Sequence, residues 1–156
     1  MSRSLQKVVA ADIDELMTWF PDEHSVDIWG GPKFRYPFDR ASFHKDCCWK
    51  DLPSYCLREA NDDFVAFGQL RFRFGRPHLA RLVVKPECRG QGVGRHLLEE
   101  MLALARVAQD HAEVGLFVYK HNQPAFECYK AVGFQIHPYP VDAPMADKCY
   151  YMTITL

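Results

Sequence analysis

The chain has 156 residues, with 19 Lys and Arg against 20 Asp and Glu and a formal net charge of −1. Apolar residues make up 48% and charged residues 25%, which excludes a disordered chain, a collagen and a coiled coil. The balanced charge excludes a surface that is basic throughout, so we expect no nucleic acid as a partner. The length is that of one domain, which we place at residues 1–156.

The first residues and the cysteines indicate a compartment. Asp12 and Asp14 interrupt the apolar stretch near the N-terminus, which therefore does not resemble a signal peptide. No apolar run approaches the ~18 residues of a membrane-spanning helix, so we expect no membrane partner. We expect the six cysteines to be reduced thiols in a cytoplasmic protein, and because their spacing fits no common zinc pattern we predict no metal site.

Two short helices are predicted in the first third of the chain. The first covers residues 13–20, where apolar residues recur at steps of three and four, and it ends before Pro21. The second covers residues 39–46 and begins at an aspartate cap. Glycine and proline interrupt the segment 22–37 between them, which we predict to be irregular.

The rest of the chain alternates strands with two longer helices. Apolar residues at helical spacing predict a helix over 93–108, and a proline near its start and a glycine after its end predict another over 123–132. This order predicts an α+β fold, an α/β sandwich with a mixed, mostly antiparallel central sheet flanked by about four helices. The predicted strands cover residues 55–59, 64–74, 78–85, 114–119, 134–137 and 150–156.

A glycine-rich loop joins a predicted strand to the longest predicted helix. The loop reads Arg89-Gly90-Gln91-Gly92-Val93-Gly94. Glycines let the backbone turn sharply and come close to a ligand, and the first N–H groups of a helix have no partners within it. Such a loop is suited to bind an anion, above all a phosphate.

Two common phosphate-binding motifs do not fit this loop. A P-loop needs Gly-Lys-Ser/Thr at its end, whereas Gly94 is followed by Arg95 and His96. A dinucleotide fingerprint that starts at Gly90 needs a small residue at position 95, which is arginine. A plain tight connection without a ligand is the alternative.

The segment Leu82–Gly94 resembles motif A of the GCN5-related N-acetyltransferases (GNAT), a strand followed by R/Q-x-x-G-x-G/A and a helix. Asn122, Tyr129 and Gly133-Phe134 resemble the second motif of that family, in which an asparagine, a helix tyrosine and a Gly-Phe pair recur. Together the two motifs extend the resemblance from about residue 64 to residue 134. Residues 1–60 match the family only in their helical outline.

The resemblance implies acetyl-CoA as co-substrate, in a V-shaped opening between two parallel strands that splay apart, here 78–85 and 114–119. The pyrophosphate would bind backbone N–H groups of the loop, and the pantetheine arm would pair with a strand edge. One N–H near Val84 would polarise the thioester carbonyl. The residues expected to bind the cofactor are Leu82, Val83, Val84, Arg89, Gly90, Gln91, Gly92, Val93, Gly94, Arg95 and Asn122.

The resemblance also implies direct attack of a primary amine on the thioester while both substrates are bound. Tyr129 takes the place of the family's helix tyrosine, and we expect it to protonate the departing sulfur. We expect His78 to be the general base, because strand alternation places it on one face with Leu82 and Val84. Two alternatives stay open: a one-residue bulge would move His78 off that face, and water alone is the other candidate base.

The sequence therefore predicts an acetyl-CoA-dependent N-acetyltransferase that acts on a small amine or a peptide N-terminus. Acidic residues 22, 23 and 27 near Trp29, and Asp142 and Asp147 in the late loop, are of the type that binds an ammonium ion. We therefore expect the acceptor against the N-terminal helices, with the connection 137–148 on its other side. The alternatives are a non-catalytic acyl-CoA-binding module and a transferase for a longer acyl-CoA. A homodimer is expected by analogy alone.

Overall fold

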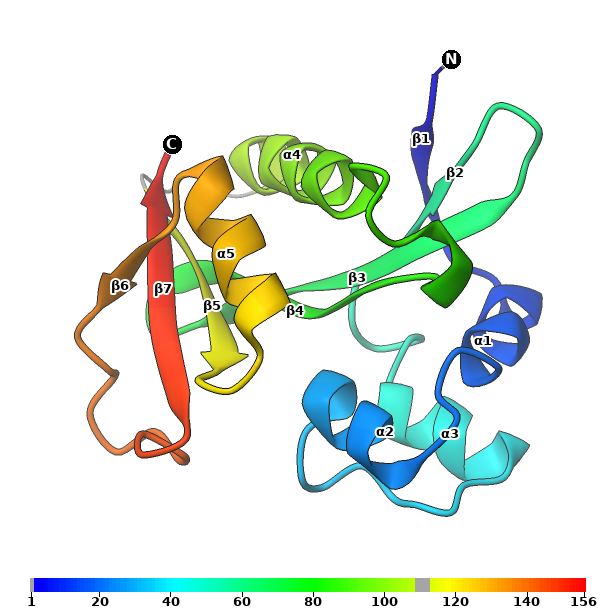
Figure 1. Cartoon of the computed structure of the whole chain (residues 1–156), viewed down its shortest axis with the longest axis horizontal. Helices are drawn as coiled ribbons and strands as arrows, with labels where there is room; N and C mark the ends of the chain where they lie inside the picture. Colours follow the sequence, from blue (N-terminus) through cyan, green and yellow to red (C-terminus); the bar gives the residue numbers. More distant parts are fainter. Residues whose placement is uncertain (1, 109–112) are drawn as a thin grey trace. The chain divides into compact units, whose positions relative to one another are not determined.

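The computed structural model describes residues 2–108 and 113–156 of the chain (Figure 1). The described residues form five α-helices, one 3-10 turn and seven strands, and the strands hydrogen-bond in the order β1-β2-β3-β4-β5-β7-β6. In chain order the elements are β1 (Ser4–Lys7), α1 (Ala10–Met17), α2 (Glu23–Gly30), α3 (Arg40–Cys47), β2 (Ser54–Arg58), β3 (Phe64–Arg73), β4 (Arg76–Val84), η1 (Pro86–Cys88), α4 (Val93–Ala108), β5 (Glu113–Tyr119), α5 (Gln123–Val132), β6 (Gln135–His137) and β7 (Cys149–Thr155).

The sheet is mixed and mostly antiparallel, as the sequence predicts. β2 pairs antiparallel with β1 and β3, and β7 pairs antiparallel with β5 and β6. β4 and β5 are parallel, and their pairing covers His78 with Gly115 and Leu79 with Leu116. β4 continues to Val84 and β5 to Tyr119 beyond these two pairs.

The chain forms two compact units. One consists of Met1–Gln69 and Arg81–Leu97, and the other of Leu70–Ala80 and Leu98–Leu156. β3, β4 and α4 run from one unit into the other, and the single domain over residues 1–156 stays a prediction. No helix of the described residues is long and apolar enough to cross a membrane, and these residues contain no cluster of His, Cys, Asp and Glu that would hold a metal ion.

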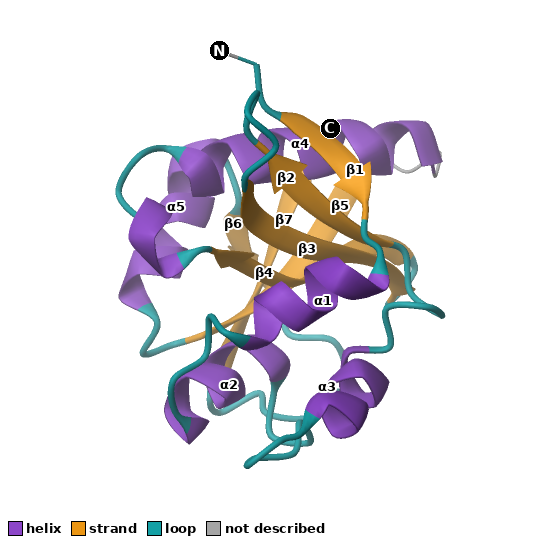
Figure 2. Ribbon diagram, turned by 90° about the vertical axis from the view of Figure 1, so that its right-hand side faces the viewer, coloured by secondary structure: helices purple, strands orange, loops and turns teal. Residues whose placement is uncertain are grey.

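The core of the first unit is aromatic. Helices α1, α2 and α3 lie together in this unit, as Figure 2 shows. Trp29 is at the centre of the core, with its ring centroid 4.5 Å from Phe20, 5.3 Å from Phe34 and 5.7 Å from Phe43. Large aromatic side chains dominate the energetics of a core because each buries a large apolar area. These contacts hold three short helices, none longer than eight residues, in place.

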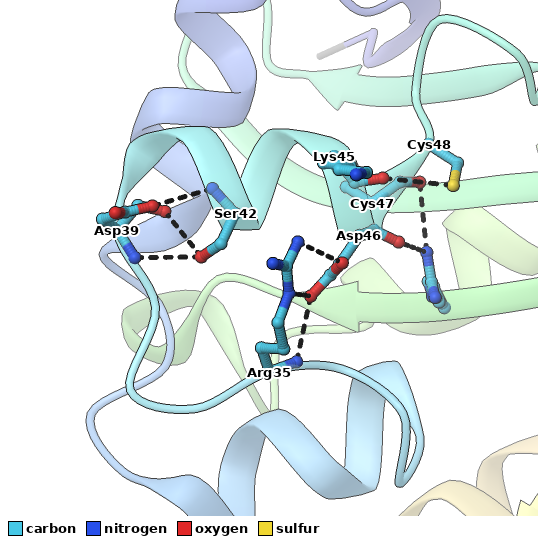
Figure 3. Close-up of polar contacts among 8 residues, drawn as sticks. Arg35, Asp39, Ser42, Lys45, Asp46, Cys47 and Cys48 are labelled. Atoms are coloured by element: carbon cyan, nitrogen blue, oxygen red, sulfur yellow. Dashed lines mark hydrogen bonds and ion pairs between the residues drawn. The ribbon is translucent and has the colours of Figure 1, made fainter.

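Two of these short helices have the same N-terminal cap. Asp22 accepts a hydrogen bond from the Ser25 backbone N–H at 2.8 Å at the start of α2, and Asp39 does the same with Ser42 at 2.8 Å at the start of α3 (Figure 3). Each cap satisfies donors that a helix start leaves open. α2 lies in the segment 22–37, so the prediction of an irregular segment is wrong over Glu23–Gly30.

The other predicted elements agree with the structure within a few residues. The first predicted helix is found three residues earlier, as α1, and the second is α3. β1 was not predicted, because it is a four-residue edge strand whose mostly exposed side chains give no apolar alternation. The prediction of an α+β sandwich with a mixed sheet is confirmed, with five helices in the described residues rather than about four.

The second unit is built on the pairing of β5 with β7, which covers all seven residues of β5. Gly115 faces the ring of Tyr151, and a Cβ at this glycine would lie 2.4 Å from the Tyr151 hydroxyl. Gly115 therefore makes room for a large buried side chain. Other buried residues of this unit are Leu79, Val114, Leu116, Val118, Phe134 and Met152.

Candidate functional site

The glycine loop follows β4 and the 3-10 turn η1. Gly90 has a φ of +76° and Gly92 a φ of +78°, a conformation that other residues rarely adopt. A Cβ at either position would meet no protein atom within 4 Å, so the space beside the loop is open. Arg89, at the start of the loop, is exposed. The loop thus offers open backbone and a cationic side chain to a ligand.

Helix α4 starts directly behind the loop. Val93 anchors its first turn with 1% of its surface exposed, and the His96 N–H donates to the Gly92 carbonyl at 3.2 Å. By helix geometry, the N–H groups of Val93 and Gly94 have no acceptor within the helix. α4 is 16 residues long, and its N-terminus carries the positive end of the helix dipole. This end of the helix suits a phosphate.

The strand that leads to the loop is irregular at Arg81. This residue has a φ of +52° in the interior of β4. A left-handed residue interrupts the alternation of a strand, which favours the alternative in which a bulge moves His78 off the face of Leu82 and Val84. The irregular backbone lies at Arg81, three residues before Val84, and the free N–H expected near Val84 stays a prediction.

An acidic hollow lies beside α2 in the same unit. It has a volume of about 380 Å³, and its walls include Glu23, Asp27, Phe34 and Tyr36. Glu23 and Asp27 are four residues apart on α2, so their carboxylates share one side of the helix. The hollow combines two anionic groups with aromatic rings, a combination that attracts cations.

Two residues predicted to help bind an ammonium ion have structural roles instead. The Asp22 carboxylate caps α2, and its hydrogen bonds from Ser25 lower the pKa of that carboxyl. Trp29 is buried in the core with 8% of its surface exposed, and its Nε1–H donates to the Arg81 carbonyl at 2.7 Å. Of the acidic residues predicted near α2, Glu23 and Asp27 remain candidates, and the role of Asp142 and Asp147 stays a prediction.

His78 lies in the second unit and is 2% exposed. Its ring centroid is 5.1 Å from Phe117, 6.2 Å from Phe74 and 6.5 Å from Tyr151, and its Nδ1 has no hydrogen-bond partner. Burial among these rings, together with the positive charges of two nearby arginines, lowers the pKa of His78 to about 3. The imidazole is therefore neutral and a weak proton acceptor at neutral pH.

Tyr129 and Asn122 belong to α5 and its start, also in the second unit. The Tyr129 ring lies 6.0 Å from Phe134, and burial raises the pKa of its hydroxyl well above the ordinary value of 10.0. Its hydroxyl therefore keeps its proton at neutral pH. Asn122 precedes α5, and its side chain makes no capping hydrogen bond to the helix.

Comparison with known proteins identifies the family. Residues 13–134 match the model of the acetyltransferase (GNAT) family. The peptidyl-lysine N-acetyltransferase YiaC of Escherichia coli (strain K12) is 31% identical to this chain over 112 residues, which are 69% of the chain and 68% of that protein. The chain belongs to the GNAT acetyltransferase family. The sequence resemblance is thus confirmed across both motifs.

Solved structures agree with this GNAT fold over nearly the whole chain. Spermidine N-acetyltransferase from Vibrio cholerae, in complex with CoA and spermine, has a TM-score of 0.76 and 15% identity and covers 98% of this chain and 95% of its own. Aminoglycoside acetyltransferase AAC(6')-Ib in complex with coenzyme A has a TM-score of 0.75 and 19% identity. It covers 99% of this chain and 95% of its own. At these identities the likeness concerns the fold.

As a GNAT protein, the chain is an acetyl-CoA-dependent N-acetyltransferase. Acetyl-CoA supplies the acetyl group as a thioester. The left-handed glycines at 90 and 92 and the first turn of α4 fit its pyrophosphate, because a Cβ at either glycine would meet no atom of the described residues within 4 Å. The residue roles predicted from the sequence stay predictions.

The structure distributes the predicted site residues over the two units. The first contains the loop, the strand segment 82–84 and the acidic hollow, and the second contains His78, Asn122 and Tyr129. The sequence analysis missed Arg81, because an arginine gives no local signal for a left-handed backbone as a glycine does.

Proposed function

We propose that this acetyltransferase modifies a primary amine of a small molecule that carries more than one positive charge. The observation that carries the proposal is the hollow beside α2, where Glu23 and Asp27 are one helical turn apart next to Phe34 and Tyr36. A second ammonium group bound there would orient the acceptor and leave the reacting amine free.

A second hollow in the same unit has a different character. It has a volume of about 340 Å³, and its walls include Arg40, Lys45 and Lys50. Cationic walls repel an ammonium ion, so of these two hollows the one beside α2 suits the acceptor. The two carboxylates there favour a molecule with several amines over a peptide lysine, which carries a single amine.

Names of similar proteins support this acceptor class. The spermidine and aminoglycoside N-acetyltransferases, which share the fold, act on molecules that carry several amines. The similarity to a peptidyl-lysine N-acetyltransferase supports a lysine side chain as the acceptor, and we retain it as the second candidate.

Backbone groups hold the co-substrate in this proposal. The N–H groups from Gly90 to the first turn of α4 bind the pyrophosphate, with Arg89 as an added cation, and the strand segment 82–84 pairs with the pantetheine arm. Asn122 contacts the co-substrate or positions α5. Binding both substrates together replaces a collision in solution, which is a large part of the rate enhancement.

The reaction requires one proton to leave the ammonium and one to reach the departing sulfur. We propose Tyr129 as the donor to the sulfur, and the raised pKa of its hydroxyl supports the proposal because the proton is present at neutral pH. The burial of His78 weighs against its predicted role as the base, since a pKa of about 3 makes the imidazole a weak proton acceptor. We therefore propose that the ammonium ion loses its proton to solvent water before the neutral amine attacks, with no side chain as the base.

The test measures amine-dependent release of free CoA thiol from acetyl-CoA. The panel consists of spermidine, kanamycin and a lysine peptide with a blocked N-terminus. We expect the amines with several charges to give the highest kcat/KM. Binding of acetyl-CoA without release of thiol for any amine would instead indicate a CoA-binding module, and preference for the peptide would indicate the second candidate.

Substitutions in the hollow test where the acceptor binds. We expect Glu23→Gln and Asp27→Asn to raise the KM for the preferred multiply charged amine about tenfold each, with kcat changed less than about threefold, because they remove charge attraction without touching the reacting groups. Asp51→Asn, at the cationic hollow, is the matched control and should leave KM unchanged. An equal effect of all three would exclude the hollow beside α2.

A further inference from the structure

Arg81 has a left-handed backbone in the interior of a strand. Its φ of +52° lies in a region that non-glycine residues seldom occupy. Such a conformation costs free energy and persists only where the surroundings determine it, and residues of this kind concentrate at functional sites. The contacts of Arg81 show what holds it.

The Arg81 backbone is fixed through its carbonyl oxygen. The Trp29 Nε1–H donates to this oxygen at 2.7 Å. The Trp29 ring stacks on Phe20 and Phe43, with interplanar angles of 30° and 8°. A donor whose ring packs against two other rings in a core has little freedom to move, so the direction of the Arg81 peptide group is fixed with it.

The Arg81 side chain is fixed at the ends of two helices. Nη1 donates to the backbone oxygens of Asp46 at 2.8 Å and Cys47 at 3.1 Å, and Nη2 donates to the Gly30 oxygen at 3.5 Å. Asp46 and Cys47 end α3, as Figure 3 shows, and Gly30 ends α2. The last carbonyls of a helix are unpaired within it and carry partial negative charge, which the guanidinium satisfies.

Aromatic rings complete the surroundings of the guanidinium. Its carbon lies 5.3 Å from the centroid of the Phe34 ring and 5.8 Å from that of Trp29. Both are distances at which an aromatic face attracts a cation. Lysine carries the same charge, but it lacks the planar guanidinium whose N–H groups donate to three carbonyls at once.

These contacts connect two parts of the proposed site. α2 carries Glu23 and Asp27 of the acidic hollow, and β4 continues from Arg81 directly into residues 82–84, the proposed partner of the pantetheine arm. We propose that Arg81 is a positioning residue that sets the acceptor-binding helices α2 and α3 against the left-handed turn of β4, and so holds the backbone of residues 82–84 in the direction that acetyl transfer requires. This inference rests on the acceptor and co-substrate sites proposed above.

The experiment uses a variant that separates backbone from side chain. Arg81→Gly accepts the left-handed conformation without strain and removes the guanidinium. We expect kcat with the preferred amine to fall at least about tenfold, while the Kd for CoA changes less than about threefold, because misplacement of bound reactants affects the rate more than binding. Methylguanidinium at millimolar concentration should restore part of the lost kcat. In a folded Arg81→Gly protein, a kcat within twofold of the unaltered enzyme would overturn the proposal.

Arg35→Met is the matched control. Arg35 forms an ion pair with the side chain of Asp46 at 2.9 Å, whereas Arg81 donates to the backbone oxygen of the same residue. We expect its kcat to stay within twofold, and a loss equal to that of Arg81→Gly would overturn the proposal. If Arg81→Gly fails to fold, Arg81→Lys replaces it with the same expected split between kcat and Kd.

A second readout does not depend on the acceptor. Hydrogen exchange of the backbone amides of residues 82–84 should be at least about tenfold faster in Arg81→Gly than in the unaltered protein or Arg35→Met, because the anchored turn no longer holds them. Unchanged exchange would overturn the role of Arg81 even if no amine is acetylated. Absence of acetylation with every amine, together with faster exchange, would contradict the proposed function and leave the positioning role supported.

Discussion

His78 and Arg81 are three residues apart in β4, and the structure gives them opposite surroundings. His78 is buried among aromatic rings with its Nδ1 unpartnered, whereas the Arg81 guanidinium donates to three helix-end carbonyls and its own carbonyl accepts from Trp29. His78, which has the more familiar catalytic side chain of the two, is therefore held in its neutral form. Arg81, whose side chain is less familiar in catalysis, is hydrogen-bonded to the ends of α2 and α3. A side chain's chemistry shows its role only once its partners are known.

The first prediction concerns the end of β4, where backbone geometry dominates. We expect Gly92→Val to lower CoA affinity at least about 100-fold, because valine is strained at a φ of +78° and its side chain enters the open space beside the loop. Isothermal titration calorimetry with CoA measures the effect.

Gly75→Val is the control for that backbone strain. Gly75 has a φ of +74° and equally open surroundings, but it lies in the turn between β3 and β4. Its CoA affinity should stay within threefold of the unaltered protein. Equal losses of CoA affinity in both variants would mean that backbone strain, and not impaired phosphate binding by the loop, causes the effect.

The second prediction concerns Tyr129. We expect Tyr129→Phe to lower kcat about 10- to 100-fold with an unchanged Kd for CoA, because it removes one proton donor and little of the packing. Steady-state kinetics and CoA binding measure the two quantities. Tyr150→Phe, whose ring packs 5.2 Å from Phe126 of the same helix, serves as control and should keep kcat. An unchanged rate in Tyr129→Phe would remove this residue from the chemistry.

The third prediction concerns the stability cost of His78. Its pKa falls from 6.5 in the unfolded chain to about 3 in the folded one, so the unfolded state binds more protons between these values. The free energy of unfolding must therefore decrease as the pH falls below 6.5. We expect His78→Phe to remove about 2 kcal/mol of the decrease between pH 7 and pH 5. Urea denaturation at both pH values measures it.

Leu79→Val provides the reference for this titration. Leu79 is 1% exposed and next to His78 in the strand, but it does not titrate. The difference in the free energy of unfolding between Leu79→Val and the unaltered protein should be the same at both pH values. A pH dependence of His78→Phe identical to that of the unaltered protein would show that His78 is not held neutral by burial.

Much of the fold was predictable because its signals are local. The helix α4 follows from apolar residues at steps of three and four, and β5 from a short apolar strand pattern, so both are found within a residue of their predicted bounds. α2 escaped prediction because eight residues offer few repeats and glycines follow at once. Its Asp22 and Ser25 cap was the signal that would have revealed it.

The candidate site divides in the same way. The glycine loop was predictable because left-handed backbone positions favour glycine, and these glycines stand at fixed spacing before a helix. The turn at Arg81 was not, because distant contacts with Trp29 and the ends of α2 and α3 impose it.

The amino-acid order by itself determined the strand, loop and helix that we propose to bind a phosphate, since each depends on neighbours along the chain. Only the tertiary structure decided that His78 is neutral and that Arg81 is anchored. The hydrogen-bond partners of Arg81 lie 34 to 52 positions away along the chain, and no local pattern encodes them.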